Sequence, residues 1–296
     1  MGLGAEAPPS LAARVARSAV AVAAAFVLAA CTKPPVESDP RGGEDLSFPT
    51  RPSLRIATQD VESIDPVELE TLDEIVVADQ VFDGLVAYEP ETTELVPSAA
   101  QSWEVRDGGR TFVFHLRGGA TFHDGSPVQA EDFVFAWNRL ADPAAAAPFA
   151  FLLESVAGYD SYQSDVQVRE LEGVRALDAT TLEVRLSSPW PDFVSVAGHP
   201  ALSPLPSREG ADLGPAVRVI GNGPFRAGGT IARQEEFHLE RFDDHFAAEP
   251  AIRRLTFRPF EDADDAWPEF LAGDVDIAPI PASLLAEAEG RYGEAG

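Results

Sequence analysis

The sequence predicts a mixed α/β fold, and three observations support this class. Short segments in which every second residue is apolar, as in strands, alternate with longer segments in which apolar residues recur every three or four positions, as in helices. Hydrophobic residues make up 45% of the 296 residues, which is enough for a packed core. The 25 prolines and 23 glycines provide turns and loops between the periodic segments.

The first 30 residues have the pattern of an export signal. Arg14 and Arg17 precede twelve apolar residues, 19–30, and the run ends in small side chains. Twelve residues are too few to cross a bilayer as a helix, which needs about 20. The tetrapeptide LAAC, which ends in the only cysteine, Cys31, resembles the lipobox of bacterial lipoproteins. We therefore expect cleavage before Cys31 and acylation of its thiol, the alternative being a buried free cysteine.

The folded part is expected to follow a solvated tether over residues 31–52, which are rich in Pro, Gly, Ser and acids. Alternating apolar residues predict a strand at 53–58, and helical spacing predicts a helix over 71–82, with a loop at 60–70 between them. The other predicted elements are turns at 107–109, 123–125 and 221–224, strands at 111–116, 181–186, 237–241 and 255–258, and helices at 130–141 and 265–271.

Two proline-containing segments lead to more specific expectations. Residues 199–206 hold three prolines, which predicts an extended connector that is not packed and that could mark a domain boundary. Pro268 lies in the predicted helix 265–271 and is expected to occupy its first turn, where its missing N–H costs nothing.

Composition and motifs exclude several functions. The formal net charge of −27 without a basic patch argues against a nucleic-acid partner. No histidine pair has the spacing of a helical zinc site, and there is no phosphate loop, G-x-S-x-G or G-x-G-x-x-G. The acidic run 261–265 could suggest calcium but fits a helix N-cap better. We expect a protein without cofactor or metal that is not an enzyme; a secreted hydrolase stays open only because carboxylates are plentiful.

One long segment resembles a known family. Residues 96–140 read VPSAAQSWEVRDGGRTFVFHLRGGATFHDGSPVQAEDFVFAWNRL, which is similar to the signature of family 5 of the extracellular solute-binding proteins, the peptide, oligopeptide and nickel receptors of ABC importers. Four further segments match the family in the same order. They are IATQDVESIDP (56–66), LDATTLEV (177–184), GNGPF (221–225) and FLAGDVDI (270–277).

The resemblance implies a fold and a set of site residues. The fold would be the two-lobed α/β fold of periplasmic binding proteins of type II, with mixed sheets. The residues implied to hold a peptide are Glu70, Thr71 and Leu72, just after the first loop, and Phe149, which stands in the place of a ligand-contacting tyrosine and lacks its hydroxyl. A strand around 277–280 would lead toward the hinge. On the residues alone, Leu72 and Phe149 could equally be core.

The resemblance also implies domains, partners and location. Residues 53–84 and 206–296 would form the core of the first lobe, and residues 85–205 an inserted subdomain. Family members are about twice as long as the mature chain, so we expect the second lobe to be absent because of a truncated gene model, with a natural fragment as the alternative. The expected partners are a peptide, an ABC permease and ATPase, and the extracytoplasmic membrane face through the lipid anchor, the protein being a monomer. A nickel complex or an oligosaccharide as ligand, or a sensor lipoprotein without transport, stays open.

Overall fold

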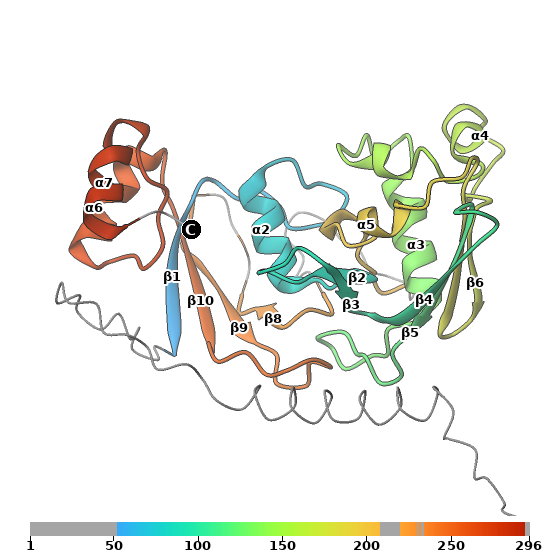
Figure 1. Ribbon diagram of the computed structural model, residues 1–296, viewed down its shortest axis with the longest axis horizontal. Helices are drawn as coiled ribbons and strands as arrows, with labels where there is room; N and C mark the ends of the chain where they lie inside the picture. The colour runs from blue at the N-terminus through green and yellow to red at the C-terminus, as the bar shows by residue number, and fades with distance from the viewer. Residues whose placement is uncertain (1–51, 208–219, 230, 232–233, 294–296) are drawn as a thin grey trace, which may run out of the picture. The chain divides into compact units, whose positions relative to one another are not determined.

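The computed structural model describes residues 52–207, 220–229, 231 and 234–293 (Figure 1). The predicted signal, Cys31 and all of the predicted tether except Pro52 lie outside these residues. No helix in the described part of the chain is long and apolar enough to cross a membrane.

The first sheet joins the start of the described chain to three strands that come after residue 220. Its order is β1 (Ser53–Thr58), β10 (Arg254–Pro259), β9 (Phe237–Arg241) and β8 (Phe225–Ala227), with β1 and β10 parallel and the other pairs antiparallel. These strands confirm the predictions at 53–58, 237–241 and 255–258. The parallel pair brings together strands that are about 200 residues apart in sequence.

The second sheet is antiparallel throughout. Its order is β4 (Ala100–Arg106), β5 (Thr111–Leu116), β7 (Thr181–Arg185) and β6 (Val174–Asp178). The turn between β4 and β5 uses Asp107, Gly108 and Gly109, all at positive φ, as the D-G-G sequence predicts. A smaller hairpin pairs β2 (Val86–Tyr88) with β3 (Leu95–Pro97).

The helix α3 (Ala130–Leu140) packs against β6 and β7 of this sheet (Figure 1). It lies where the spacing of Phe133, Trp137 and Leu140 predicts it, and these three side chains are completely buried. Phe133 and Trp137, together with Phe112 and Phe114 on β5, form an aromatic cluster within the main core.

The helix α2 (Leu72–Val81) packs on β8 and on the 3-10 helix η2 (Pro200–Leu202). The G-N-G sequence at 221–223 closes its C-terminal end: the N–H of Gly223 donates to the carbonyl of Val81 over 2.8 Å. A Cβ atom at Gly221 or Gly223 would lie within 3 Å of the backbone of Val81, which explains the two glycines.

The remaining described elements are short. They are the helices α4 (Tyr159–Ser164), α5 (Phe193–Val196), α6 (Ala263–Ala272) and α7 (Leu285–Tyr292), and the 3-10 helices η1 (Ala150–Leu153) and η3 (Ala282–Leu284). Asp262 is the N-cap of α6 and accepts the N–H of Asp265 over 3.0 Å, which confirms the helix-cap interpretation of the acidic run.

The expectation of an unpacked connector at residues 199–206 is wrong, because this segment packs in the core. Residues 200–206 are buried, and residues 200–202 form η2. The indole Nε1 of Trp137 donates to the carbonyl of Leu202 over 2.8 Å. The apolar proline rings pack well in a core, and Pro200 starts the 3-10 turn, where its fixed φ is compatible.

Two further expectations are wrong. Pro268 is the sixth residue of α6, so it lies beyond the first turn. Its ring is exposed, as is Asp264, whose carbonyl loses the helical hydrogen bond and can be hydrated. At 277–280 only Ile277 pairs, in a single parallel bridge to Ile56, because Pro279 and Pro281 have no N–H with which to continue a ladder.

Candidate functional site

The loop before α2 is held by one buried carboxylate. Glu74 is 3% exposed and accepts four backbone N–H groups, those of Glu62 and Ser63 on Oε1 and those of Glu70 and Thr71 on Oε2, over 2.9–3.4 Å. In return, the hydroxyl of Thr71 accepts the N–H of Glu74 over 3.2 Å, which completes a capping box. Glu74 therefore fixes both the beginning of the loop, at residues 62–63, and its end, at residues 70–71, to the first turn of α2.

A second anchor ties the same loop to α3. Arg139 donates from both terminal nitrogens to the two oxygens of Asp65, over 2.5 and 2.7 Å. The side chain of Asp65 is 4% exposed, and its Oδ1 also accepts the N–H of Val67. A bidentate pair of this kind fixes orientation as well as distance.

The three predicted ligand residues at this helix start have different surroundings. Glu70 is exposed, and its backbone N–H donates a hydrogen bond to the carboxylate of Glu74. Thr71 is the N-cap. Leu72, the first residue of α2, is 75% exposed and is therefore not a core residue. Its aliphatic side chain is in contact with solvent at a helix end that the capping box holds in place.

Phe149 lies directly before η1 and is half-buried. Its ring centroid lies 4.6 Å from that of His199 and 6.0 Å from that of Phe151, which is 56% exposed. Phe149 therefore packs beside an exposed aromatic ring and an imidazole, at the edge of the core.

An open concavity of about 400 Å³ lies between α2 and the segment around His199. It is lined by Ile75, Asp79, Tyr88, Leu152, Ser195, Val196, Gly198, His199 and Pro200. Ile75 follows Leu72 by one helical turn, and Leu152 follows Phe149 by three residues in η1, so each lies close to the nominated residue on the same face. The structure thus places the two nominated segments at the borders of one concavity.

The polar groups of this concavity are set by their neighbours. The hydroxyl of Tyr88 donates to the carbonyl of Ser195 over 2.8 Å. His199 accepts the N–H of Ala201 on Nδ1 over 3.1 Å, and burial lowers its pKa, so the ring is neutral at pH 7. Asp79 is exposed, but partial desolvation beside the walls and the negative charge of Asp83 raise its pKa.

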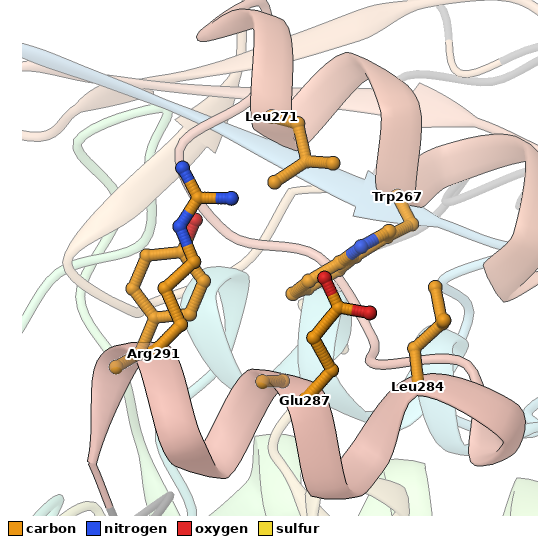
Figure 2. A pocket seen from close by; sticks show the side chains of 7 residues that line it. Trp267, Leu271, Leu284, Glu287 and Arg291 are labelled. Atoms are coloured by element: carbon orange, nitrogen blue, oxygen red, sulfur yellow. The ribbon is translucent and has the colours of Figure 1, made fainter.

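None of the four predicted ligand residues lines this concavity directly, and none lines either of two other hollows. One, of about 420 Å³, lies where the parallel strands β1 and β10 end and is lined by Gln59, Asp60, Gln234, Pro259, Phe260 and Glu261. Figure 2 shows the other, between α6 and α7, where the indole of Trp267 points toward α7. Its volume of about 20 Å³ has room for one water molecule, so this second hollow is a packing defect between helices.

The sequence reasoning missed Glu74, Asp79 and His199. The T-L-D-E sequence at 71–74 is a capping-box signature and could have revealed Glu74. Asp79 follows Leu72 by two helical turns and so shares its face, a signal that periodicity contains. No pattern in the sequence indicates that His199 lies beside Phe149. Among the described residues, no group of three His, Cys, Asp or Glu side chains could hold a metal ion.

Comparison with known proteins finds curated peptide-binding relatives. The oligopeptide-binding protein OppA of Salmonella typhimurium is 33% identical over 225 residues, 74% of this chain and 41% of the relative. OppA of Haemophilus influenzae is 36% identical over 224 residues, 73% of this chain and 41% of the relative. The chain therefore spans about two fifths of the length of these curated relatives.

Solved structures show the same architecture. The murein tripeptide-binding protein MppA, in its unliganded open form, superposes with a TM-score of 0.75 at 27% identity, over 82% of this chain and 48% of that one. H. influenzae OppA in complex with RPPGFSPFR superposes with a TM-score of 0.74 at 33% identity, over 81% and 48%. The fold is therefore that of the periplasmic oligopeptide-binding proteins.

Residues 94–294 match the model of the bacterial extracellular solute-binding proteins, family 5 Middle. This chain belongs to that family, whose members are binding proteins.

Proposed function

We propose that this chain is the first lobe, with its inserted subdomain, of a substrate-binding lipoprotein that captures extracellular peptides and delivers them to an ABC permease and its ATPase. The core of the lobe would be residues 53–84 and 206–296, and the subdomain residues 85–205. Such a receptor acts by closing around its ligand, because the closed state binds the ligand better, and it needs no covalent chemistry.

The concavity between α2 and His199 is the observation that carries this proposal. It is open, mostly apolar and of a size typical of small-ligand sites, about 300–1,000 Å³. It adjoins the segment of Glu70, Thr71 and Leu72 and the ring of Phe149, both of which the family resemblance implies as ligand contacts. The names of the relatives, which bind oligopeptides and murein peptides, favour a peptide as the ligand.

Isothermal titration of the full-length protein against di- to hexapeptides tests the ligand class. We expect saturable binding of at least one peptide length, and no binding of any peptide would refute the claim. A nickel complex or an oligosaccharide that binds where peptides do not would move the protein to another ligand class within the family.

The lipid anchor is tested separately. Cys31 follows the apolar run that the peptidase would remove, and we propose that its thiol bears the lipid. Metabolic labelling with radioactive palmitate should label the wild-type protein but not Cys31→Ser, which should leave the membrane fraction. A chromosomal deletion that leaves peptide uptake unchanged would favour the sensor function over transport.

A further inference from the structure

The concavity between α2 and His199 combines an aliphatic wall with one acidic group. Ile75, Leu152 and Val196 contribute apolar surface, and among the described residues that line the concavity Asp79 is the only acidic one. Burial lowers the pKa of His199, so its ring is neutral at pH 7, and the hydroxyl of Tyr88 donates to the carbonyl of Ser195. No described lining residue carries a positive charge, so the formal charge of the described lining is negative.

The carboxylate of Asp79 is not engaged by other described groups. Its neighbour Asp83 is: it accepts the hydroxyl of Ser98 over 3.2 Å and pairs with Nε2 of His245 at 2.6 Å. No basic side chain in the described part of the chain forms an ion pair with Asp79. The side chain is reachable by solvent and yet is flanked by the apolar walls.

We propose that this concavity selects a basic side chain of the bound peptide, one with an aliphatic stem and a cationic end. The stem would lie against Ile75, Leu152 and Val196, and the cation would pair with Asp79. Long basic side chains bind in this way because their methylene groups bury apolar area while the charged end stays near an acid and water. The inference depends on the proposed peptide-binding function.

The electrostatics of Asp79 support this assignment. The walls remove part of the hydration of Asp79, and Asp83, just beyond the C-terminal end of α2, repels its charge; both effects raise its pKa. A cation bound beside Asp79 would offset both the lost hydration and the repulsion from Asp83, and would stabilise the charged carboxylate. The selection should therefore weaken on acidification at a pH above that at which an ordinary aspartate is protonated.

Three peptides that differ at one position test the proposal by isothermal titration at pH 7.5 and low salt. The position carries lysine, norleucine or glutamate, so that the first two share the stem and differ in the charge. We expect the lysine peptide to bind about three- to tenfold more tightly than the norleucine peptide, and the glutamate peptide to bind least tightly. The position is scanned along the peptide, since only the residue placed in the concavity should show the preference.

Asp79→Asn should reduce the ratio of the affinities for the lysine and norleucine peptides to less than about twofold. Asp264→Asn is the matched control, because it removes the same charge from an exposed helical turn of α6 and should keep the full preference. Thermal denaturation of both variants confirms that they are folded. Equal affinity for the lysine and norleucine peptides at every position would overturn the inference while leaving peptide binding intact. Failure of every peptide to bind would instead overturn the proposed function.

Discussion

The guanidinium of Arg139 on α3 donates two hydrogen bonds, one from each terminal nitrogen, to the two carboxylate oxygens of Asp65 in the loop before α2. The pair joins residues 74 positions apart and fixes the loop that leads to Glu70, Thr71 and Leu72. The proposed ligand contacts therefore depend on a charge that lies outside the concavity itself.

Arg139→Met should destabilise the protein by about 3 kcal/mol, because it keeps the aliphatic stem but leaves the buried carboxylate of Asp65 without its cation. Urea denaturation measures the change. The matched control is Arg106→Met, which breaks the exposed pair with Glu104 and should cost less than about 1 kcal/mol. Similar losses in the two variants would show that the buried pair is not special.

Glu74→Gln should destabilise the protein by about 1–3 kcal/mol, because the amide can present only one acceptor oxygen to the four N–H groups that the carboxylate satisfies. Amide exchange in residues 62–71 should become faster, as mass spectrometry can show. Glu131→Gln on the exposed first turn of α3 is the control and should change neither quantity. If amide exchange in residues 62–71 is unchanged in Glu74→Gln, Glu74 does not position this loop.

Leu72→Ala should weaken peptide binding at least about threefold and alter the free energy of unfolding by no more than about 0.5 kcal/mol, since the side chain is 75% exposed. Val166→Ala provides the comparison, because Val166 is 77% exposed and lies just after α4, away from the proposed ligand segments in the sequence. Titration of each variant with the same peptide gives the affinities. Equal affinities for both variants would contradict a ligand contact at Leu72.

Stability should fall as the pH drops from 6.5 to 4, in part because of His123. Its Nε2 lies 3.0 Å from the carbonyl of Gly223, and its Nδ1 accepts the N–H of Gly221, so the network needs the neutral ring. Burial, chiefly, lowers the pKa of His123 to about 4. The unfolded chain then binds more protons than the folded one between about pH 4 and 6.5, which removes up to about 3 kcal/mol.

Urea denaturation of the wild type and of His123→Gln across this pH range isolates the effect, because acid residues elsewhere contribute equally to both. The two stabilities should converge as the pH falls. A constant difference from pH 7 to pH 4 would show that His123 titrates at an ordinary pKa.

Periodicity predicted the local elements well and the long-range packing poorly. The apolar alternation of residues 53–58 and 111–116 and the helical spacing around Trp137 correspond to β1, β5 and α3. Each of these elements buries one face, so the positions of its apolar residues in the local sequence reveal it. Short strands such as β8 and the single bridge at Ile277 depend on partners far away in sequence, and no local pattern indicates them.

The candidate site shows the same division. The family resemblance brought Glu70, Thr71, Leu72 and Phe149 into consideration, but it could not indicate that α2 and η1 border one concavity. That contact depends on the segment at 199–206, whose prolines suggested an unpacked connector and which is in fact buried against Trp137. Asp79 gains its significance only from the walls that this packing supplies.

Hydrogen–deuterium exchange of the full-length protein, with and without a peptide found by titration, tests the location of the ligand most directly. The account predicts slower exchange in residues 70–80 and 149–153 when the peptide is bound, with no change in α4 at 159–164. Protection confined to other parts of the protein, with 70–80 and 149–153 unaffected, would contradict it.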